Sequence, residues 1–166
     1  MSIMRDVLCN TSPLLYLHQL GRLELLPDLY QRITIPKAVA HELREGMRLG
    51  HAVPRVEDLP WLAVEEVEHA SLLRLVADLD AGEREVLALA AGRPASLLLL
   101  DDGQARRYAT MLGLTFTGTL GVLLRAKQRG FLDRVSPCLD RLQALGFRIA
   151  PALRASVLKL AGEPPG

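Results

Sequence analysis

Short apolar segments alternate along the chain with longer helix-forming segments, and this alternation restricts the fold more than any other feature of the sequence. The apolar segments include "RDVLCN", "RITIP" and "ASLLLL", whose central residues show no polar alternation. Strands that are apolar on both faces are typical of a parallel sheet with helices packed on each side. We therefore expect an α/β fold around a central, mostly parallel sheet.

Turn and capping residues between these segments set the boundaries of the expected elements. Strands are expected at residues 5–10, 32–36, 62–67, 95–100 and 114–118, the third of them as a weak strand or a connector. Helices are expected at residues 11–20, 23–30, 37–47, 71–79, 81–92, 102–113, 119–130, 137–146 and 151–162, the second of them as a short helix or a turn. Thr11 or Ser12 is the expected cap of the first helix, with Pro13 in its first turn, where the missing N–H does no harm.

The length of 166 residues and the hydrophobic content of 49% indicate one domain with a large core. We expect this domain over residues 1–160 and a frayed tail over residues 161–166. The apolar runs are too short to span a bilayer, and the first residues lack the long apolar segment of a signal peptide. The two cysteines, Cys9 and Cys138, form no C-x-x-C motif, so we expect buried thiols and a cytoplasmic protein.

Charge is distributed unevenly, although the formal net charge of the chain is only +1. Residues 1–92 hold 9 Lys/Arg and 14 Asp/Glu, and residues 93–166 hold 11 Lys/Arg and 5 Asp/Glu. The excess of acidic residues in the first part favours binding of a cation, and the excess of basic residues in the second favours binding of phosphate groups.

Polar oxygen ligands gather at one expected edge of the sheet. Asn10 follows the first strand, and Asp101 and Asp102 follow the run "LLLL". Glu42 lies in the helix after the second strand, and Glu83 lies in the first turn of its helix. In open parallel sheets, ligands bind at the carboxyl ends of the strands. Carboxylates at close range repel one another, and a hard cation such as Mg²⁺ or Mn²⁺ removes that cost, so this set predicts metal-assisted phosphoryl chemistry.

Each of these residues, taken alone, also has a structural interpretation. Asp102 is a possible cap of the helix that follows it. Asp80 and Glu83 have the D-x-x-E spacing of a capping box, in which Glu83 is paired locally. Glu42 is a possible solvated helix residue, and Asn10 a possible turn former. The prediction of a metal site rests on their joint placement.

Basic and small polar residues of the second part form a second group of candidates. The segment "TGTLG" precedes a helix, where Thr119 either caps the helix or lies beside N–H groups that bind a phosphate. Five basic residues of this part form either a basic rim around the site or ordinary solvated helix faces. They are Arg106, Arg107, Arg125, Lys127 and Arg129. No G-x-G-x-x-G follows the first strand and no P-loop motif occurs. Binding of a mononucleotide or dinucleotide therefore has no support from a sequence motif.

Four stretches of the chain resemble the PIN-domain nucleases, in particular the compact prokaryotic branch often found as toxins of toxin–antitoxin pairs. They are "VLCNTSPLLYLHQLGRLELLPDLYQRITIPKAVAHEL", "LDAGEREVLALA", "LLLLDDGQARRYATMLGLTFTGTLGVLLRAKQRG" and "LGFRIAPAL", in the expected order over most of residues 6–155. The resemblance implies a three-layer α/β/α fold and a Mg²⁺- or Mn²⁺-dependent ribonuclease. By position it assigns metal binding to Asn10, Glu42, Glu83, Asp101 and Asp102, the four acids being catalytic.

The resemblance also implies the partners of the protein, which are RNA, a small antitoxin protein and a second copy of the chain. Thr119, Arg106 and Arg107 would orient the substrate. PIN nucleases typically have an aspartate where this chain has Asn10, and asparagine keeps an oxygen ligand but loses the charge. The alternative hypothesis is therefore a PIN-fold module that binds RNA or protein without useful catalysis. An unrelated α/β phosphohydrolase is disfavoured because its Asp-x-Asp is absent after the first strand.

Overall fold

The computed structural model describes residues 5–68 and 71–165. Its centre is a five-stranded sheet with the strand order β3-β2-β1-β4-β5, in which every neighbouring pair is parallel. The strands are β1 (Val7–Cys9), β2 (Ile33–Pro36), β3 (Leu62–Glu65), β4 (Leu97–Leu99) and β5 (Thr115–Thr117). This topology confirms the predicted parallel sheet.

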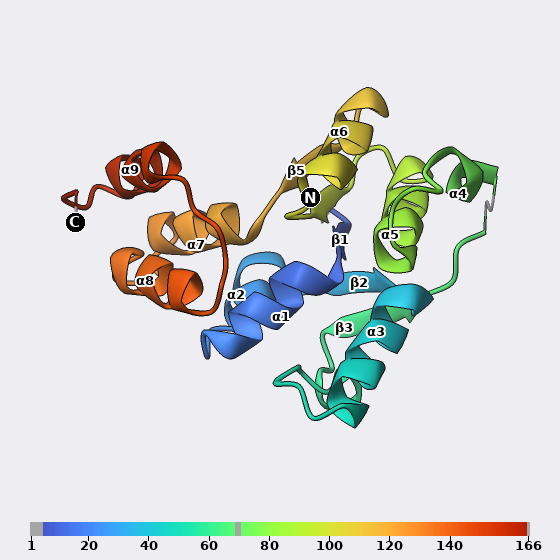
Figure 1. Cartoon of the computed structure of the whole chain (residues 1–166), viewed down its shortest axis with the longest axis horizontal. Helices are drawn as coiled ribbons and strands as arrows, with labels where there is room; N and C mark the ends of the chain where they lie inside the picture. Colours follow the sequence, from blue (N-terminus) through green and yellow to red (C-terminus); the bar gives the residue numbers. More distant parts are fainter. Residues whose placement is uncertain (1–4, 69–70, 166) are drawn as a thin grey trace.

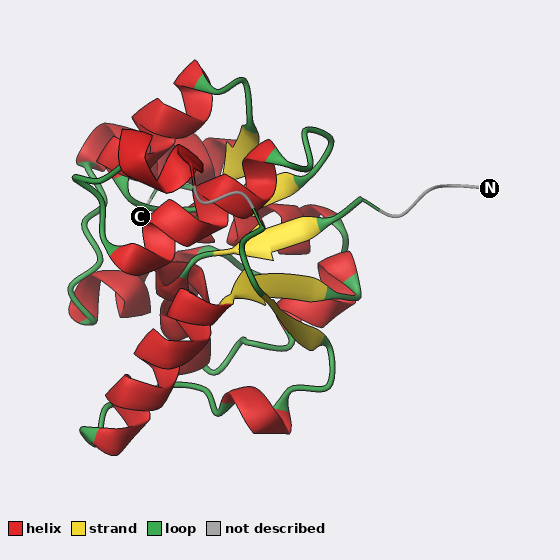
Figure 2. Cartoon of the chain, turned by 90° about the vertical axis from the view of Figure 1, so that its right-hand side faces the viewer, coloured by secondary structure: helices red, strands yellow, loops and turns green. Residues whose placement is uncertain are grey.

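Helices cover both faces of the sheet, as the two views in Figures 1 and 2 show. They are α1 (Thr11–Gln19), α2 (Leu25–Tyr30), α3 (Lys37–Arg48), α4 (Ser71–Leu75), α5 (Ala81–Ala91), α6 (Gly103–Met111), α7 (Thr119–Gln128), α8 (Ser136–Ala144) and α9 (Pro151–Leu160). One core lies between the sheet and α1, α2, α3, α7, α8 and α9, and the second lies against α5 and α6. The protein therefore has the three layers, α/β/α, that we predicted.

Alternate residues of each central strand supply these two cores. In β1, Val7 and Cys9 pack into the core beside α1, whereas Leu8 packs into the core beside α5. In β4, Leu99 lies on the first side and Leu98 on the second. Because successive side chains of a strand point to opposite faces, both faces need apolar residues, and this explains the uninterrupted apolar runs.

Three local details differ from the sequence-based expectation. Helix α4 ends at Leu75 instead of residue 79, because a turn closed by the Leu79 N–H and the Val76 carbonyl leads directly into α5. The N-cap of α1 is Asn10 and not Thr11 or Ser12. Residues 161–163 pack on the domain within the segment predicted to fray, because the buried Glu163 accepts the N–H groups of Val135 and Ser136 beside α8.

Two further expectations concern the thiols and membrane segments. Cys9 and Cys138 are both buried free thiols, as predicted. Among the described residues, no helix has the length and apolar character that crossing a membrane requires.

Candidate functional site

The carboxyl ends of β1 and β4 bring Asn10 and Asp101 to neighbouring positions of the sheet edge. The backbone N–H of Asn10 donates to the Leu99 carbonyl at 3.0 Å, which extends the pairing of β1 and β4 by one residue. On the other side, the Leu100 N–H donates to the Thr117 carbonyl at 2.8 Å and continues the pairing of β4 with β5. Asp101 is thus the first residue beyond a rigid, doubly paired strand.

Three hydrogen bonds hold the carboxylate of Asp101 in place. Thr119, which is fully buried, donates its backbone N–H to Oδ1 and its hydroxyl to Oδ2, both at 2.7 Å. Ser12 donates its hydroxyl to Oδ2 at 3.0 Å. These donors come from α7 and α1, so the half-buried Asp101 joins both helices to the end of β4. A carboxylate has about four acceptor positions, so acceptor capacity remains on Oδ1.

Arg106 and Asp101 both approach Gly118 so closely that no Cβ fits between their side chains as they lie. A Cβ at residue 118 would lie 2.5 Å from Asp101 Oδ1 and closer still to Arg106 Nη2. Arg106 is fixed by donating Nε–H to the Leu100 carbonyl at 2.7 Å and by lying 5.2 Å from the centre of the Phe116 ring. The structure therefore brings Arg106 to the predicted site. Arg107 is exposed and makes no hydrogen bond or ion pair with the described residues.

Glu42 is held by two donors from other helices. The Thr11 hydroxyl donates to Oε2, and the Gly82 N–H donates to Oε1 at 3.0 Å. A Cβ at residue 82 would lie 2.7 Å from Oε1, so the close approach requires glycine. Burial raises the pKa of Glu42, while these two donors oppose the rise. Thr11 and Ser12 thus fix Glu42 and Asp101 instead of capping α1.

Glu83 lies among other carboxylates. Its N–H donates to Asp80 Oδ1 at 2.8 Å, which confirms one half of the predicted capping box. Burial, followed by the charges of Asp80 and Asp102, raises the pKa of the Glu83 carboxyl to about 7. Asp80 also raises the pKa of Glu42. Asp80 therefore belongs to the same acidic neighbourhood, although the sequence analysis treated it only as a cap.

Asp102 has the structural role that its sequence position suggested. Its Oδ2 accepts the Ala105 N–H at 2.9 Å and caps α6. The residue is exposed, and its charge still contributes to the raised pKa of Glu83. Asp102 thus combines a cap with a place beside Glu83.

Asn10 contributes an oxygen that has no partner. Its side-chain Oδ1 is buried without a hydrogen bond in the described part of the protein, and the residue is 5% exposed. A buried polar atom without a partner costs about 1–3 kcal/mol, and such atoms call for an explanation such as a bound ion. The amide oxygen of Asn10 and the carboxylates of its neighbourhood are the donor type that Mg²⁺ and Mn²⁺ prefer. The chemistry of these donors suits such a cation.

The acids nevertheless form separate contacts rather than one cluster. Asp101 is held with Thr119, Glu42 with Gly82, and Glu83 with Asp80. Within residues 5–68 and 71–165, no three His, Cys, Asp or Glu side chains converge on a point that could hold a metal ion.

Sequence reasoning missed the groups that hold the acids. Ser12, Thr11 and Gly82 donate to them, and Gly118 lets Arg106 approach. The hydroxyl pair directly after a strand in "NTSP" is a signal that could have found two of these groups, because strand ends are where ligands bind.

One of three comparisons with known proteins found a match. A family model described as a PIN domain matches residues 6–163. The chain gave no significant match to curated proteins or to solved structures. The matched region contains all five strands and every acidic residue discussed above. By this match the chain belongs to the PIN-domain family, whose fold is of the nuclease type.

Proposed function

We propose that the protein is a metal-dependent endoribonuclease that serves as the toxin of a toxin–antitoxin pair. The observation that carries the proposal is the buried, unpartnered Oδ1 of Asn10 at the same sheet edge as Asp101. A structural role leaves that oxygen unexplained, whereas a cation ligand accounts for it and for the neighbouring acids.

Asn10, Glu42, Glu83, Asp101 and Asp102 would hold Mg²⁺ or Mn²⁺. When bound, the metal supplies Lewis-acid activation of water and neutralises charge on the phosphodiester. The chain itself supplies the alignment. Thr119 and Ser12 hold Asp101 before any ligand binds, so in this proposal Thr119 acts through Asp101, and its role in orienting the substrate stays a prediction.

Glu83 is suited to proton transfer. With a pKa of about 7, its carboxyl is present in both protonation states near neutral pH. A group with a pKa near the working pH is the most effective general acid or base. In this proposal Glu83 accepts a proton on its side-chain carboxylate only while that carboxylate does not ligate the metal, because a bound cation would lower its pKa.

A groove beside Asp101 supports RNA as the substrate. It has a volume of about 380 Å³, and its walls include Arg106, Arg148, Phe116 and Phe147. Guanidinium groups bind phosphates, and aromatic rings offer surfaces on which unpaired bases stack. A single strand placed in this groove would bring a phosphodiester to Asp101. The antitoxin partner and a homodimer are proposed from the family resemblance alone.

A second candidate function is binding of RNA or protein without catalysis. The absence of a carboxylate at Asn10 favours it, and so do the hydrogen bonds that already occupy both oxygens of Glu42. This hypothesis predicts that the groove binds a strand and that divalent metal changes nothing.

The deciding experiment combines metal titration with a cleavage assay. Mn²⁺ is titrated calorimetrically into the wild type, Asp101→Asn and the control Asp133→Asn, which changes an exposed aspartate outside the site. The same proteins are incubated with labelled single-stranded RNA in Mg²⁺, Mn²⁺ or EDTA. The nuclease hypothesis is supported if the wild type and Asp133→Asn bind metal and cleave RNA, and Asp101→Asn does neither. RNA binding without metal binding or cleavage supports the non-catalytic module.

A further inference from the structure

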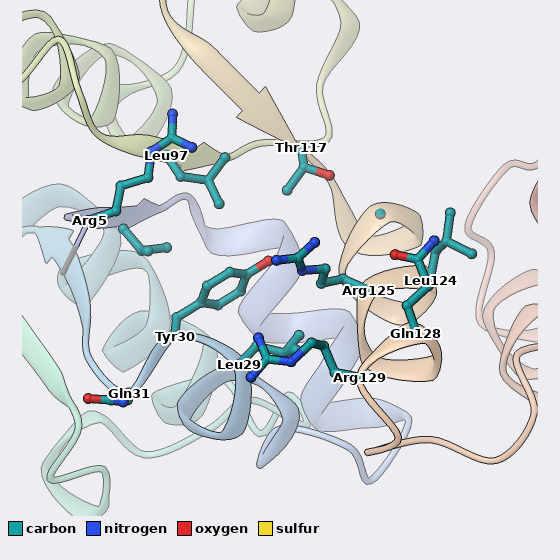
Figure 3. A pocket seen from close by; sticks show the side chains of 12 residues that line it. Arg5, Leu29, Tyr30, Gln31, Leu97, Thr117, Leu124, Arg125, Gln128 and Arg129 are labelled. Atoms are coloured by element: carbon teal, nitrogen blue, oxygen red, sulfur yellow. The ribbon is translucent and has the colours of Figure 1, made fainter. Parts of the chain in front are cut away.

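A second pocket in the described part of the chain has a basic lining that contains no acidic residue. It has a volume of about 590 Å³ and lies between the first residues of β1 and β4, the end of α2 and one face of α7 (Figure 3). None of Asn10, Glu42, Glu83, Asp101 and Asp102 lines it. The residues from α7 and its end lie at 121, 124, 125, 128 and 129, which is the spacing of one helix face.

Three guanidinium groups surround this pocket without an anion. Arg125 and Arg129 come from α7 and its end, and Arg5 lies across from them beside Leu97 (Figure 3). Among the described residues, neither Arg125 nor Arg129 forms an ion pair or a side-chain hydrogen bond, and no acidic residue lines the pocket. Clustered like charges repel one another, so an anion bound among them would relieve that repulsion.

The arginines are held in place by neighbouring groups. Arg5 donates Nε–H to the Ala95 carbonyl at 2.8 Å, and Arg129 lies 5.8 Å from the centre of the Phe131 ring. The hydroxyl of the half-buried Tyr30 is directed toward the guanidinium of Arg125 (Figure 3). The contacts of Arg5 and Arg129 position these two groups before a ligand binds, which lowers the entropic cost of binding.

The backbone of the pocket also carries strain. Gln31 has a φ of 65° and a ψ of −52°, the only positive φ among the described non-glycine residues, and it lies at the centre of a γ-turn beside the pocket. Such conformations cost free energy and cluster at ligand sites, where the surrounding structure holds them in place.

We propose that this pocket binds the phosphate group of a nucleotide. Guanidinium groups match phosphate oxygens with paired hydrogen bonds, and the Tyr30 hydroxyl adds a further donor. Apolar side chains of Val7, Leu97 and Leu124 supply walls for a base, and the volume lies within the range of small-molecule sites. The proposal does not depend on cleavage at the acidic site.

The phosphate has two possible sources, a free nucleotide or one unit of an RNA strand. Thr117, Gly121 and Leu124 line both this pocket and the groove beside Asp101, so the two lie next to each other along α7. A strand bound in the groove could therefore extend into the basic pocket. The shared chemistry is the same in both cases, and the experiment separates them.

The test measures binding by calorimetry in EDTA, where metal-dependent cleavage does not occur. The probes are adenosine 5′-monophosphate, adenosine, and a short 2′-O-methylated RNA strand that resists hydrolysis. The proteins are the full-length wild type, Arg125→Gln/Arg129→Gln, and the control Arg134→Gln/Arg141→Gln, which removes the same charge from exposed positions outside the pocket. If thermal unfolding shows that Arg125→Gln/Arg129→Gln does not fold, the single variant Arg129→Gln is used in its place.

We expect the monophosphate to bind at least about tenfold more tightly than adenosine, and the pocket variant to lose about tenfold or more while the control does not. If the strand displaces the monophosphate, the phosphate that the pocket binds comes from RNA. If the monophosphate binds and the strand does not displace it, the phosphate comes from a free nucleotide. The proposal is overturned if neither phosphorylated probe binds the wild type, if adenosine binds equally well, or if both double variants lose the same affinity.

Discussion

Thr119 holds Asp101 with two hydrogen bonds of 2.7 Å, one from its backbone N–H and one from its hydroxyl. The backbone bond is available to any residue except proline, but the hydroxyl bond is specific to threonine or serine. Thr119 is fully buried, so removing its hydroxyl places an apolar group beside Asp101 Oδ2 and takes a hydrogen-bond donor away from the half-buried carboxylate.

Thr119→Val keeps the shape of the side chain and removes only this donor. We expect the free energy of unfolding to fall by about 1–3 kcal/mol in a urea titration, because Asp101 Oδ2 loses one of its two donors. Thr110→Val is the matched control, since Thr110 is an exposed helical residue whose hydroxyl bonds within its own helix. A Thr119→Val protein as stable as the wild type would show that the hydroxyl does not hold Asp101.

Gly118→Ala should separate Arg106 from Asp101. The new methyl group would lie 2.5 Å from Asp101 Oδ1, so at least one of these two side chains must move. We expect a loss of about 1–3 kcal/mol in the free energy of unfolding, as for other overpacked sites, together with weaker RNA binding. The measurements are urea unfolding and a fluorescence binding assay.

Gly103→Ala is the control for this change. A Cβ at residue 103 meets nothing within 4 Å, and the glycine does not have a positive φ. The substitution should be neutral or stabilise by about 0.4–1 kcal/mol through the unfolded state. Equal behaviour of the two alanine variants would mean that Asp101 and Arg106 adapt without cost.

The strands, and their burial on both faces of the sheet, were predictable because such burial removes polar residues from the centre of a strand. "VLC" and "LLLL" have no polar residue in their centre, and the structure places successive residues of each in opposite cores. The end of α4 was not predictable in the same way. Val76 and Leu79 continue the apolar pattern of a helix, yet they reach the core from a turn. Periodicity reports which side chains are buried and not the backbone that carries them.

The placement of Asn10 and Asp101 followed from strand ends, but the groups that fix the acids did not. Thr11 and Ser12 look like helix caps in the sequence, and their acceptors lie 31 and 89 residues away. Local rules describe hydrogen bonds to nearby backbone groups and contain no information on such distant partners. The same limit applies to Gly82 and Gly118, whose small size matters only because Glu42, Arg106 and Asp101 approach them.

The raised pKa of Glu83 predicts a pH dependence of stability. Its ordinary value is 4.5, and burial with the charges of Asp80 and Asp102 raises it to about 7. Between these values the folded protein binds more protons at this site than the unfolded chain, so stability falls as pH rises and levels off above about 7. We expect urea unfolding of Glu83→Gln to show a smaller fall across this interval than the wild type.

The control for this prediction is Glu24→Gln, which removes a carboxyl group that is exposed. Its stability profile should follow that of the wild type. The raised pKa of Glu42 acts in the same direction, so part of the fall should persist in Glu83→Gln. Identical profiles of the wild type and Glu83→Gln would show that the Glu83 carboxyl titrates at its ordinary value.

Asn10→Asp tests the oxygen without a partner. Without metal, the new buried carboxylate lies at the sheet edge near Asp101, and we expect it to lower the free energy of unfolding by roughly 1–3 kcal/mol or more. With Mn²⁺, the added negative charge should strengthen binding, because ligand charge increases affinity for a hard cation. A ligand that binds only the folded state raises its stability, so Mn²⁺ should increase the melting temperature more than in the wild type.

Asn10→Ala completes this series by removing the oxygen altogether. The increase in melting temperature on adding Mn²⁺ should then rank aspartate above asparagine and asparagine above alanine, measured by differential scanning fluorimetry with EDTA as the reference. Magnesium should give the same order. If all three proteins respond equally to Mn²⁺, the metal does not contact residue 10, and the buried oxygen of Asn10 needs another explanation.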